Sequence, residues 1–176
     1  AALHVLDVFP NNAARAVVLG DGKLGLLIAR SLRGAGIDVL LVGHHASKLA
    51  LAEAVGARTV LERDVSIARD ASSFVVEATG TAGGLALGIA LTKPRGTLVL
   101  KTTVAGKTEA DLSPIVVNEI ALVGSRCGDM RRAVDALARD AIDPSPLVAA
   151  RYPLDRAEDA MKHAASKGTL KVLIEM

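Results

Sequence analysis

Three closely spaced glycines carry the clearest chemical signal in this sequence. Gly20, Gly22 and Gly25 form a Gly-x-Gly-x-x-Gly pattern directly after the apolar run 16–19. A helical pattern follows at once, over Lys23–Ala35. In this order the first glycine permits a tight turn, the second lets backbone amides approach a phosphate, and the third lets the helix pack closely on the strand. The pattern predicts a site for the pyrophosphate of a dinucleotide.

The residues between the glycines belong to the same predicted site. They are Asp21, Lys23 and Leu24. The amides of Lys23 and Leu24 lie at the start of the predicted helix, where N–H groups lack intrahelical partners and the helix dipole adds partial positive charge. Such a helix terminus binds anions. All six residues from 20 to 25 are therefore candidate cofactor-binding residues.

The end of the second predicted strand, Asp38–Val42, bears on which dinucleotide is bound. NAD enzymes place Asp or Glu about 20 residues beyond the glycines, where it binds the ribose 2′-hydroxyl. Here that region holds Gly43, His44 and His45, with Lys48 just beyond, and no carboxylate. Glycine leaves room for a 2′-phosphate, and the imidazoles and the ammonium supply donors. The sequence favours NADP(H) over NAD(H); the alternative is a solvated turn whose histidines touch nothing.

Two further strand ends supply candidate residues. Thr79 and Gly80 follow the predicted strand Ser73–Ala78, and Thr102 follows the predicted strand Thr97–Lys101. Ligands of open α/β sheets bind at the carboxyl ends of the strands. We therefore expect Thr79 and Gly80 on the adenosine side of the groove and Thr102 towards the nicotinamide. The alternative for each is an ordinary strand–helix turn.

The elements that must position these residues alternate between strands and helices. Strands are predicted at 15–20, 38–42, 58–61, 73–78, 97–101 and 120–125, and helices at 23–35, 47–55, 65–70, 85–91 and 130–141. This alternation predicts an α/β fold with a doubly wound parallel sheet. Right-handed crossovers give the Rossmann strand order 3-2-1-4-5-6.

After residue 146 the pattern changes to a short β-α-β appendage. A strand is predicted at Leu147–Tyr152, a helix at Leu154–Ala165 and a strand at Thr169–Glu175. We expect residues 1–146 to form the dinucleotide-binding domain and 147–176 to be a segment that returns to another domain. The sequence begins without Met, as expected of a piece of a longer protein.

Composition excludes several other classes of protein. Hydrophobic residues make up 51% of the 176 residues, mostly Ala, Val, Leu and Ile, which is typical of a buried parallel sheet. The net charge is only +2 and aromatic residues are 2%, which disfavours nucleic-acid binding. No apolar run is long enough to span a membrane, and we expect a cytoplasmic protein.

The residues that usually bind metals are too few and too scattered to form a site. Cys127 is the single cysteine, His44 and His45 are adjacent, and His4 and His163 lie near opposite ends of the chain. A zinc site needs at least three converging ligands. No catalytic triad or carboxylate pair is recognisable by spacing either. The sequence therefore predicts neither a metal site nor catalytic residues in this chain.

Five motifs together resemble the medium-chain, zinc-type alcohol dehydrogenase superfamily. They lie at 18–25, 76–80, 96–100, 123–126 and 171–174, in the family's order, and the threonine and sorbitol dehydrogenase-like branches look most similar. The resemblance implies a two-domain oxidoreductase that moves a hydride between a nicotinamide and an alcohol or carbonyl carbon. It also implies a catalytic zinc in an N-terminal domain that precedes this chain.

The resemblance extends to individual positions. The glycine turn matches the family's pyrophosphate turn. Gly43 and His44 match the positions that select the adenosine ribose, and here the chain departs from the Asp-bearing NAD members and looks like the NADP-using ones. Lys171 lies where relatives often carry a basic residue that reaches the pyrophosphate. The sixth strand, 120–125, pairs with its copy in many relatives; the alternative is a plain edge strand.

The resemblance thus implies the coenzyme-binding domain of an alcohol- or polyol-type dehydrogenase, inert without its zinc-bearing half. Two other classes of function stay open. One is a stand-alone NADPH sensor, against which the missing initiator Met counts. The other is an interaction module with a vestigial groove, against which the three intact glycines count.

Overall fold

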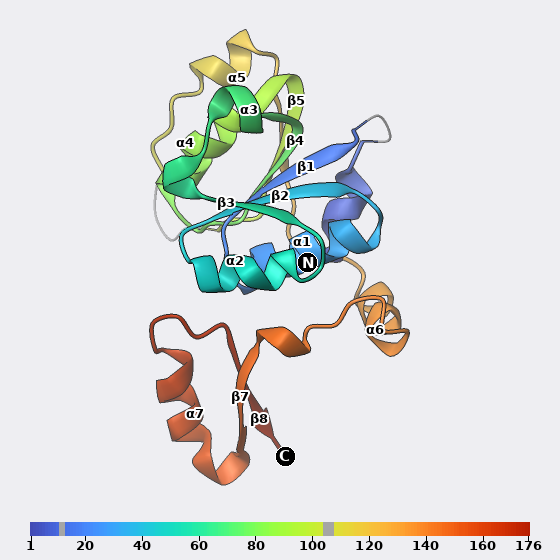
Figure 1. Ribbon diagram of the computed structural model, residues 1–176, viewed down its shortest axis with the longest axis vertical. Coiled ribbons are helices and arrows are strands. Elements are labelled where there is room, and N and C mark those ends of the chain that lie inside the picture. The colour runs from blue at the N-terminus through green and yellow to red at the C-terminus, as the bar shows by residue number, and fades with distance from the viewer. Residues whose placement is uncertain (11–12, 104–107) are drawn as a thin grey trace.

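Six parallel strands form the central sheet of the computed structural model of the protein, which describes residues 1–10, 13–103 and 108–176 (Figure 1). The order across the sheet is β3-β2-β1-β4-β5-β6, and every neighbouring pair is parallel. The strands are β1 (Arg15–Leu19), β2 (Asp38–Gly43), β3 (Arg58–Leu61), β4 (Ser72–Glu77), β5 (Thr92–Leu100) and β6 (Ala121–Gly124). This confirms the predicted doubly wound α/β sheet and its strand order.

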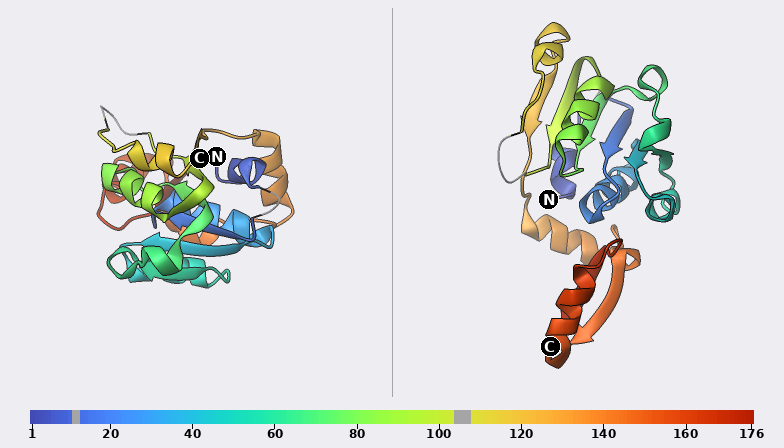
Figure 2. Two further views of the ribbon diagram at one scale, coloured as in Figure 1. Left: turned by 90° about the horizontal axis from the view of Figure 1, so that it is seen from above. Right: turned by 90° about the vertical axis from the view of Figure 1, so that its left-hand side faces the viewer.

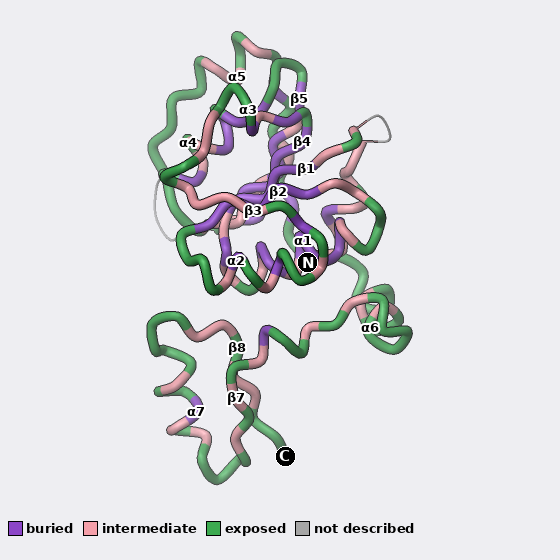
Figure 3. Tube along the Cα trace, in the orientation of Figure 1, coloured by how far each residue is buried: buried purple, intermediate pink, exposed green. Residues whose placement is uncertain are grey.

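The middle of the sheet is buried on both faces (Figure 3). Val18 of β1 lies in register between Leu41 of β2 and Val76 of β4, and all three side chains are fully buried. Val17, the preceding residue of β1, is equally buried on the opposite face. Parallel strands covered on both sides need apolar residues at consecutive positions, which explains the unbroken apolar runs in the sequence.

Helices cover both faces of the sheet (Figure 2). On one face α1 (Lys23–Gly34) and α2 (Ala46–Glu53) pack against the apolar cluster that contains Val18. On the other, α4 (Ala82–Leu91) and α5 (Ser113–Val117) pack against the cluster that contains Val17. The remaining helices before residue 140 are the 3-10 helices at Leu3–Val8 (η1) and Glu62–Asp64 (η2), and α3 (Ile67–Asp70) and α6 (Met130–Ala138).

Several predicted boundaries are wrong. The helix predicted at 85–91 begins at Ala82, where Thr81 caps it, and the helix predicted from 154 begins at Ala157, because Leu154–Arg156 is a 3-10 helix. Two further differences have local reasons. β5 begins at Thr92 rather than at Thr97, because the strand continues through Arg95, whose φ is +60°, with a shift of register against β4. α6 ends at Ala138 rather than at 141, because Asp140 adopts a left-handed conformation (φ +51°). The short helix α5 was not among the predicted elements.

The C-terminal residues form a separate two-stranded parallel sheet with one helix (Figure 1). The elements are β7 (Val148–Pro153), the 3-10 helix Leu154–Arg156 (η4), α7 (Ala157–Ala164) and β8 (Lys171–Glu175). This confirms the predicted β-α-β appendage. Most of it is exposed, and Ala160 is the one buried residue of α7.

No helix within the three described stretches is both long enough and apolar enough to cross a membrane.

Candidate functional site

Two of the three motif glycines are required by packing within the protein. Gly20 has φ +109°, and a Cβ there would lie 2.7 Å from the carbonyl oxygen of Ala78. A Cβ at Gly25 would overlap the carbonyl oxygen of Gly20. The turn between β1 and α1 therefore closes only with glycine at both positions.

Gly22 is different, because no atom of the described residues explains its missing side chain. A Cβ built there would meet none of their atoms within 4 Å. Its backbone is extended (φ −74°, ψ 171°), a conformation open to any residue, and it caps α1 without a side-chain hydrogen bond. Within the described part of the chain, the first amides of α1 thus have no side-chain partner and lie beside open space. This arrangement fits a phosphate group.

Asp21 links the glycine turn to the end of β2. Its Oδ2 accepts hydrogen bonds from the backbone N–H groups of His44 (2.8 Å) and His45 (2.7 Å), and lies 2.9 Å from Nδ1 of the His45 ring. Only 8% of the Asp21 side chain is exposed. Burial alone raises the pKa of Asp21, but the bonds from the His45 ring and from the two amides outweigh burial and hold that pKa below its ordinary value.

Gly43 makes room for this carboxylate. A Cβ at Gly43 would lie 2.6 Å from the Cβ of Asp21 and 2.8 Å from its Oδ2. The carboxylate of Asp21, which belongs to the glycine turn, therefore occupies the space beside Gly43 at the end of β2.

The two turns enclose a hollow of about 260 Å³ at the carboxyl ends of β1, β2 and β4. Its lining contains the predicted residues Gly20, Asp21, Gly22, Gly43, His44, His45 and Thr79. It also contains Glu62, whose Oε2 lies 3.1 Å from Nε2 of His44. No carboxylate follows β2 in the sequence, but Asp21 and Glu62 reach the hollow from other segments, and each is paired with a histidine.

Glu62 and Thr81 line the hollow but were not among the predicted site residues. Glu62 directly follows β3 at its carboxyl end, so the rule that ligands bind at strand ends would have found it. Thr81 caps α4, accepting a hydrogen bond from the Gly84 amide. A threonine directly before a helix-forming run is typical of an N-cap, and this pattern could have predicted Thr81.

Side chains also fix the ends of β4 and β5. Thr79 donates to Oε1 of the buried Glu77 from its backbone N–H (2.7 Å) and from its hydroxyl (2.6 Å). The Gly80 N–H donates to the Thr102 hydroxyl at 2.9 Å. Thr102 lines an adjoining hollow of about 160 Å³ that shares Thr81 with the first. The predicted residues of both strand ends thus lie together.

The two predicted lysines of the pyrophosphate site also lie in one place. Lys23, the first residue of α1, and Lys171, the first residue of β8, line the same largely apolar hollow of about 340 Å³. Lys171 thereby lies beside the first turns of α1. Leu24 and Lys48 line none of these hollows, although Lys48 is in the first turn of α2.

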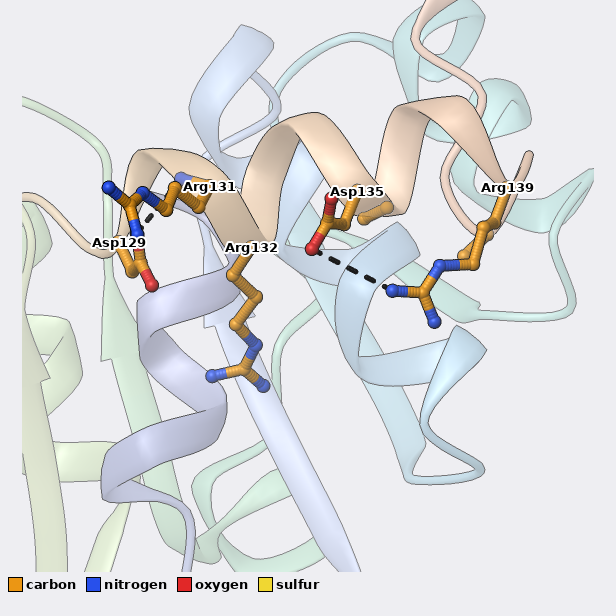
Figure 4. Close-up of a pocket in the computed structure, with 7 residues that line it drawn as sticks. Asp129, Arg131, Arg132, Asp135 and Arg139 are labelled. Carbon is orange, nitrogen blue, oxygen red and sulfur yellow. Dashed lines mark hydrogen bonds and ion pairs between the residues drawn. The ribbon is translucent and has the colours of Figure 1, made fainter.

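A hollow of about 310 Å³ along α6 lies away from the strand ends (Figure 4). Its charged side chains pair locally: Arg139 lies 3.7 Å from Asp135, and Arg132 is bonded to Asp7 of η1. Among the described residues, no group of three His, Cys, Asp or Glu side chains is placed to hold a metal ion.

The fold and the arrangement of the strand ends define a domain of the Rossmann type. The chain belongs to the family described as glucose dehydrogenase C-terminus, whose model matches residues 1–176. This agrees with the resemblance to the C-terminal half of medium-chain, zinc-type dehydrogenases.

Individual relatives agree with this assignment. Sorbitol dehydrogenase of Bombyx mori is 28% identical over 179 residues, which cover 93% of this chain and 51% of that protein. A structure described as a putative zinc-binding dehydrogenase of Sinorhizobium meliloti bound to NADP is 30% identical, with a TM-score of 0.87 over 99% of this chain and 56% of its own. L-idonate 5-dehydrogenase of Escherichia coli gives a TM-score of 0.89 at 24% identity, covering 99% and 54%. The chain spans about half the length of the curated relatives it matches.

Proposed function

We propose that this chain is the coenzyme-binding domain of an alcohol- or polyol-type oxidoreductase. The observation that carries the proposal is Gly22, whose missing side chain leaves open space beside the free amides of α1. When bound, a nicotinamide dinucleotide supplies or accepts the hydride. The glycine turn would hold its pyrophosphate, with Lys171 nearby, and the hollow around Asp21 would hold its adenosine ribose.

We also propose that NADP(H) is preferred over NAD(H). No acid projects from the end of β2, and His44, His45 and Lys48 supply potential cations there. Asp21 and Glu62 add two negative charges, but each has a histidine partner, so the four groups are neutral together when both rings are protonated. The Sinorhizobium relative, with NADP bound, supports the same preference.

Titration of the chain with NADPH and with NADH tests both proposals. Reduced nicotinamide fluorescence is a suitable signal because the chain has no Trp. We expect saturable binding of both nucleotides, with NADPH tighter. Tighter NADH binding would contradict the preference alone, and binding of neither would contradict the domain's function.

Gly22→Ser tests the proposed pyrophosphate site. Serine is a better N-cap than glycine, and its side chain meets no protein atom at the Cβ, so the free energy of unfolding should change by no more than about 0.5 kcal/mol. The side chain would occupy the space of the phosphate, so both nucleotides should bind at least roughly tenfold more weakly. Unchanged binding would remove the observation on which the proposal depends. Gly43→Asp is unsuitable here, because it would displace Asp21.

We propose further that the chain alone is catalytically inert. Hydride transfer to a carbonyl needs a group that polarises and protonates the oxygen. The resemblance assigns that role to a zinc-bearing domain outside this chain, to which 147–176 would return from the 1–146 domain. Mixing the chain with NADPH and a panel of aldehydes, ketones and ketoses should give no turnover. Turnover that survives a chelator and repurification would contradict this.

The edge strand β6 is our proposed dimer contact. It pairs with β5 on one side, and its Leu122 side chain is 44% exposed. An exposed apolar edge is a template for pairing with a second copy. Light scattering should show a dimer that Leu122→Lys dissociates, whereas a monomeric wild-type chain would mean a plain edge strand.

A further inference from the structure

One oxygen of Asp21 collects the donors of the turn between β2 and α2. Oδ2 accepts both amides, from His44 and His45, and lies against the His45 ring. Two backbone donors at the end of β2 are therefore already bonded to an anion of the protein itself. These two amides are not available to a 2′-phosphate, so the side chains of the turn are the candidates to recognise it.

The same contacts distinguish the two histidines. Nε2 of His44 lies 3.1 Å from Glu62, so its outer nitrogen is engaged. His45 is held through Nδ1, and within the described residues its Nε2 has no hydrogen-bond partner. Its side chain is 46% exposed and lines the hollow. Among the described residues each ring has one nitrogen without a partner, Nδ1 in His44 and Nε2 in His45. The two rings differ in the carboxylate that faces the other nitrogen, because Asp21 is buried and Glu62 is 38% exposed.

The partner of Nδ1 dictates what Nε2 offers. An ionised carboxylate only accepts hydrogen bonds, so the His45 Nδ1 facing Asp21 must carry a hydrogen. In the neutral ring Nε2 is then a bare acceptor, which repels phosphate. Only the protonated ring has an N–H at Nε2 and a positive charge.

We propose that Asp21 is a positioning residue for the 2′-phosphate: it fixes the His45 ring so that only protonated His45 donates from Nε2. Discrimination of NADP(H) from NAD(H) then falls as the pH rises and His45 loses its proton. This rests on the proposed preference for NADP(H). In NAD enzymes the acid beside the ribose repels a 2′-phosphate. In this proposal Asp21 has the opposite role, because it favours binding of the 2′-phosphate through His45.

The other charged groups around His45 leave a usable pH range. Asp21 comes from the glycine turn, Glu62 from η2, His44 from the end of β2, and Lys48 from the first turn of α2. Imidazole is the side-chain type among these whose charge can change near neutral pH, whereas carboxylates and ammonium groups keep theirs. A phosphate monoester loses its second proton near pH 6, so above about pH 6.5 the 2′-phosphate is mostly a dianion.

The test is the ratio of Kd for NADH to Kd for NADPH, measured at about pH 6.5 and about pH 8.5 at one ionic strength. We expect the wild-type ratio to fall roughly tenfold at the higher pH, the loss of one charge-assisted hydrogen bond. A ratio above one that is independent of pH would overturn the inference while leaving the NADP preference intact. A failure of NADPH to bind more tightly than NADH at either pH would overturn both.

Asp21→Asn distinguishes positioning from simple repulsion by the sign of its effect. If Asp21 positions His45, the variant should lower the ratio of Kd for NADH to Kd for NADPH roughly tenfold at about pH 6.5. If Asp21 only repels the phosphate, the ratio should rise. An unchanged or higher ratio overturns the proposal. A general weakening of the turn affects both nucleotides and cancels from this ratio.

Histidine variants show whether protonation of His45 or of His44 causes the pH dependence. His45→Gln keeps a donor towards Asp21 but cannot be protonated, so its ratio should be low and independent of pH. The matched control is His4→Gln, because His4 is also held by a carboxylate, at 2.9 Å from Asp7, outside the hollow. It should retain the wild-type pH dependence. Loss of the pH dependence in His44→Gln but not in His45→Gln would overturn the assignment to His45.

Discussion

The turn between β1 and α1 and the turn between β2 and α2 border one hollow, but they are held in place differently. The first is fixed by absent side chains: glycines at 20 and 25 let backbone approach backbone. The second is fixed by a present side chain, the Asp21 carboxylate, which accepts from two of its amides. Backbone contact leaves a local signature in the sequence, and a contact across 23 residues leaves none.

Because of this difference, we expect the two turns to contribute differently to nucleotide binding. The glycine turn presents free amides that suit any dinucleotide, because every nicotinamide dinucleotide has a pyrophosphate. In the β2–α2 turn the amides of His44 and His45 are bonded to Asp21, and the side chains of both histidines line the hollow. We therefore expect damage to the first turn to affect both nucleotides equally, and damage to the second to affect their discrimination.

Gly25→Ala should break the first turn and have the largest effect. The added Cβ would overlap the carbonyl oxygen of Gly20, and neither backbone segment can move without opening the contact of α1 with β1. We expect a loss of about 3 kcal/mol or more in the free energy of unfolding, with loss of binding of both nucleotides. Urea denaturation followed by circular dichroism measures the loss. A fall below about 1 kcal/mol would mean that the turn is not held by backbone contact.

Asp21→Asn should weaken the second turn in a way that depends on pH. Hydrogen bonds to a buried charge are each worth about 1.5–3 kcal/mol, so we expect a loss of about 2 kcal/mol at neutral pH. The pKa of Asp21 is lower in the folded chain than in the unfolded one, so its contribution is present above the ordinary aspartate pKa of 3.8 and is lost as the pH falls through the folded value. The difference between wild type and variant, measured by urea denaturation, should therefore shrink below about pH 4. Because Asp7 and Asp70 also have lowered pKa values, the wild type alone would not isolate this effect.

The contrast between the turns also explains how much the sequence could predict. Strand and helix alternation and the glycine motif depend on neighbours in the chain, and both the strand order and the placement of residues 20–25 followed from them. The reach of Asp21 to β2 depends on packing, so the sequence alone placed no acid at Gly43. Glu62 is the opposite case, because its position directly after β3 depends only on neighbours in the chain and is visible in the sequence.

Thr102→Val tests whether a neutral acceptor serves a turn as Asp21 does. The Thr102 hydroxyl accepts from the Gly80 amide at 2.9 Å and joins the ends of β4 and β5. Removing a neutral hydrogen bond costs about 1 kcal/mol, roughly half the loss expected for Asp21→Asn. Since no charge is involved, the loss should be the same at about pH 3 and about pH 7, which urea denaturation would show. A loss that varied with pH would mean that the buried Glu77, bonded to Thr79 on the same strand end, responds to the substitution.

Lys171→Gln should have the smallest effect, because this lysine contributes to the first turn only through its charge. It is exposed and shares a hollow with Lys23 at the start of α1, without a hydrogen bond to the turn among the described residues. An exposed charge pair is worth up to about 1 kcal/mol, so we expect NADH and NADPH each to bind roughly two- to fivefold more weakly at low salt. The two losses should be equal, because the pyrophosphate is common to both nucleotides. They should vanish near 1 M salt, where the Debye length is about 3 Å, and fluorescence titration at two ionic strengths measures this. A loss confined to NADPH would instead place the Lys171 ammonium near the 2′-phosphate. It would then contradict the expectation that the first turn affects both nucleotides equally and only the second affects their discrimination.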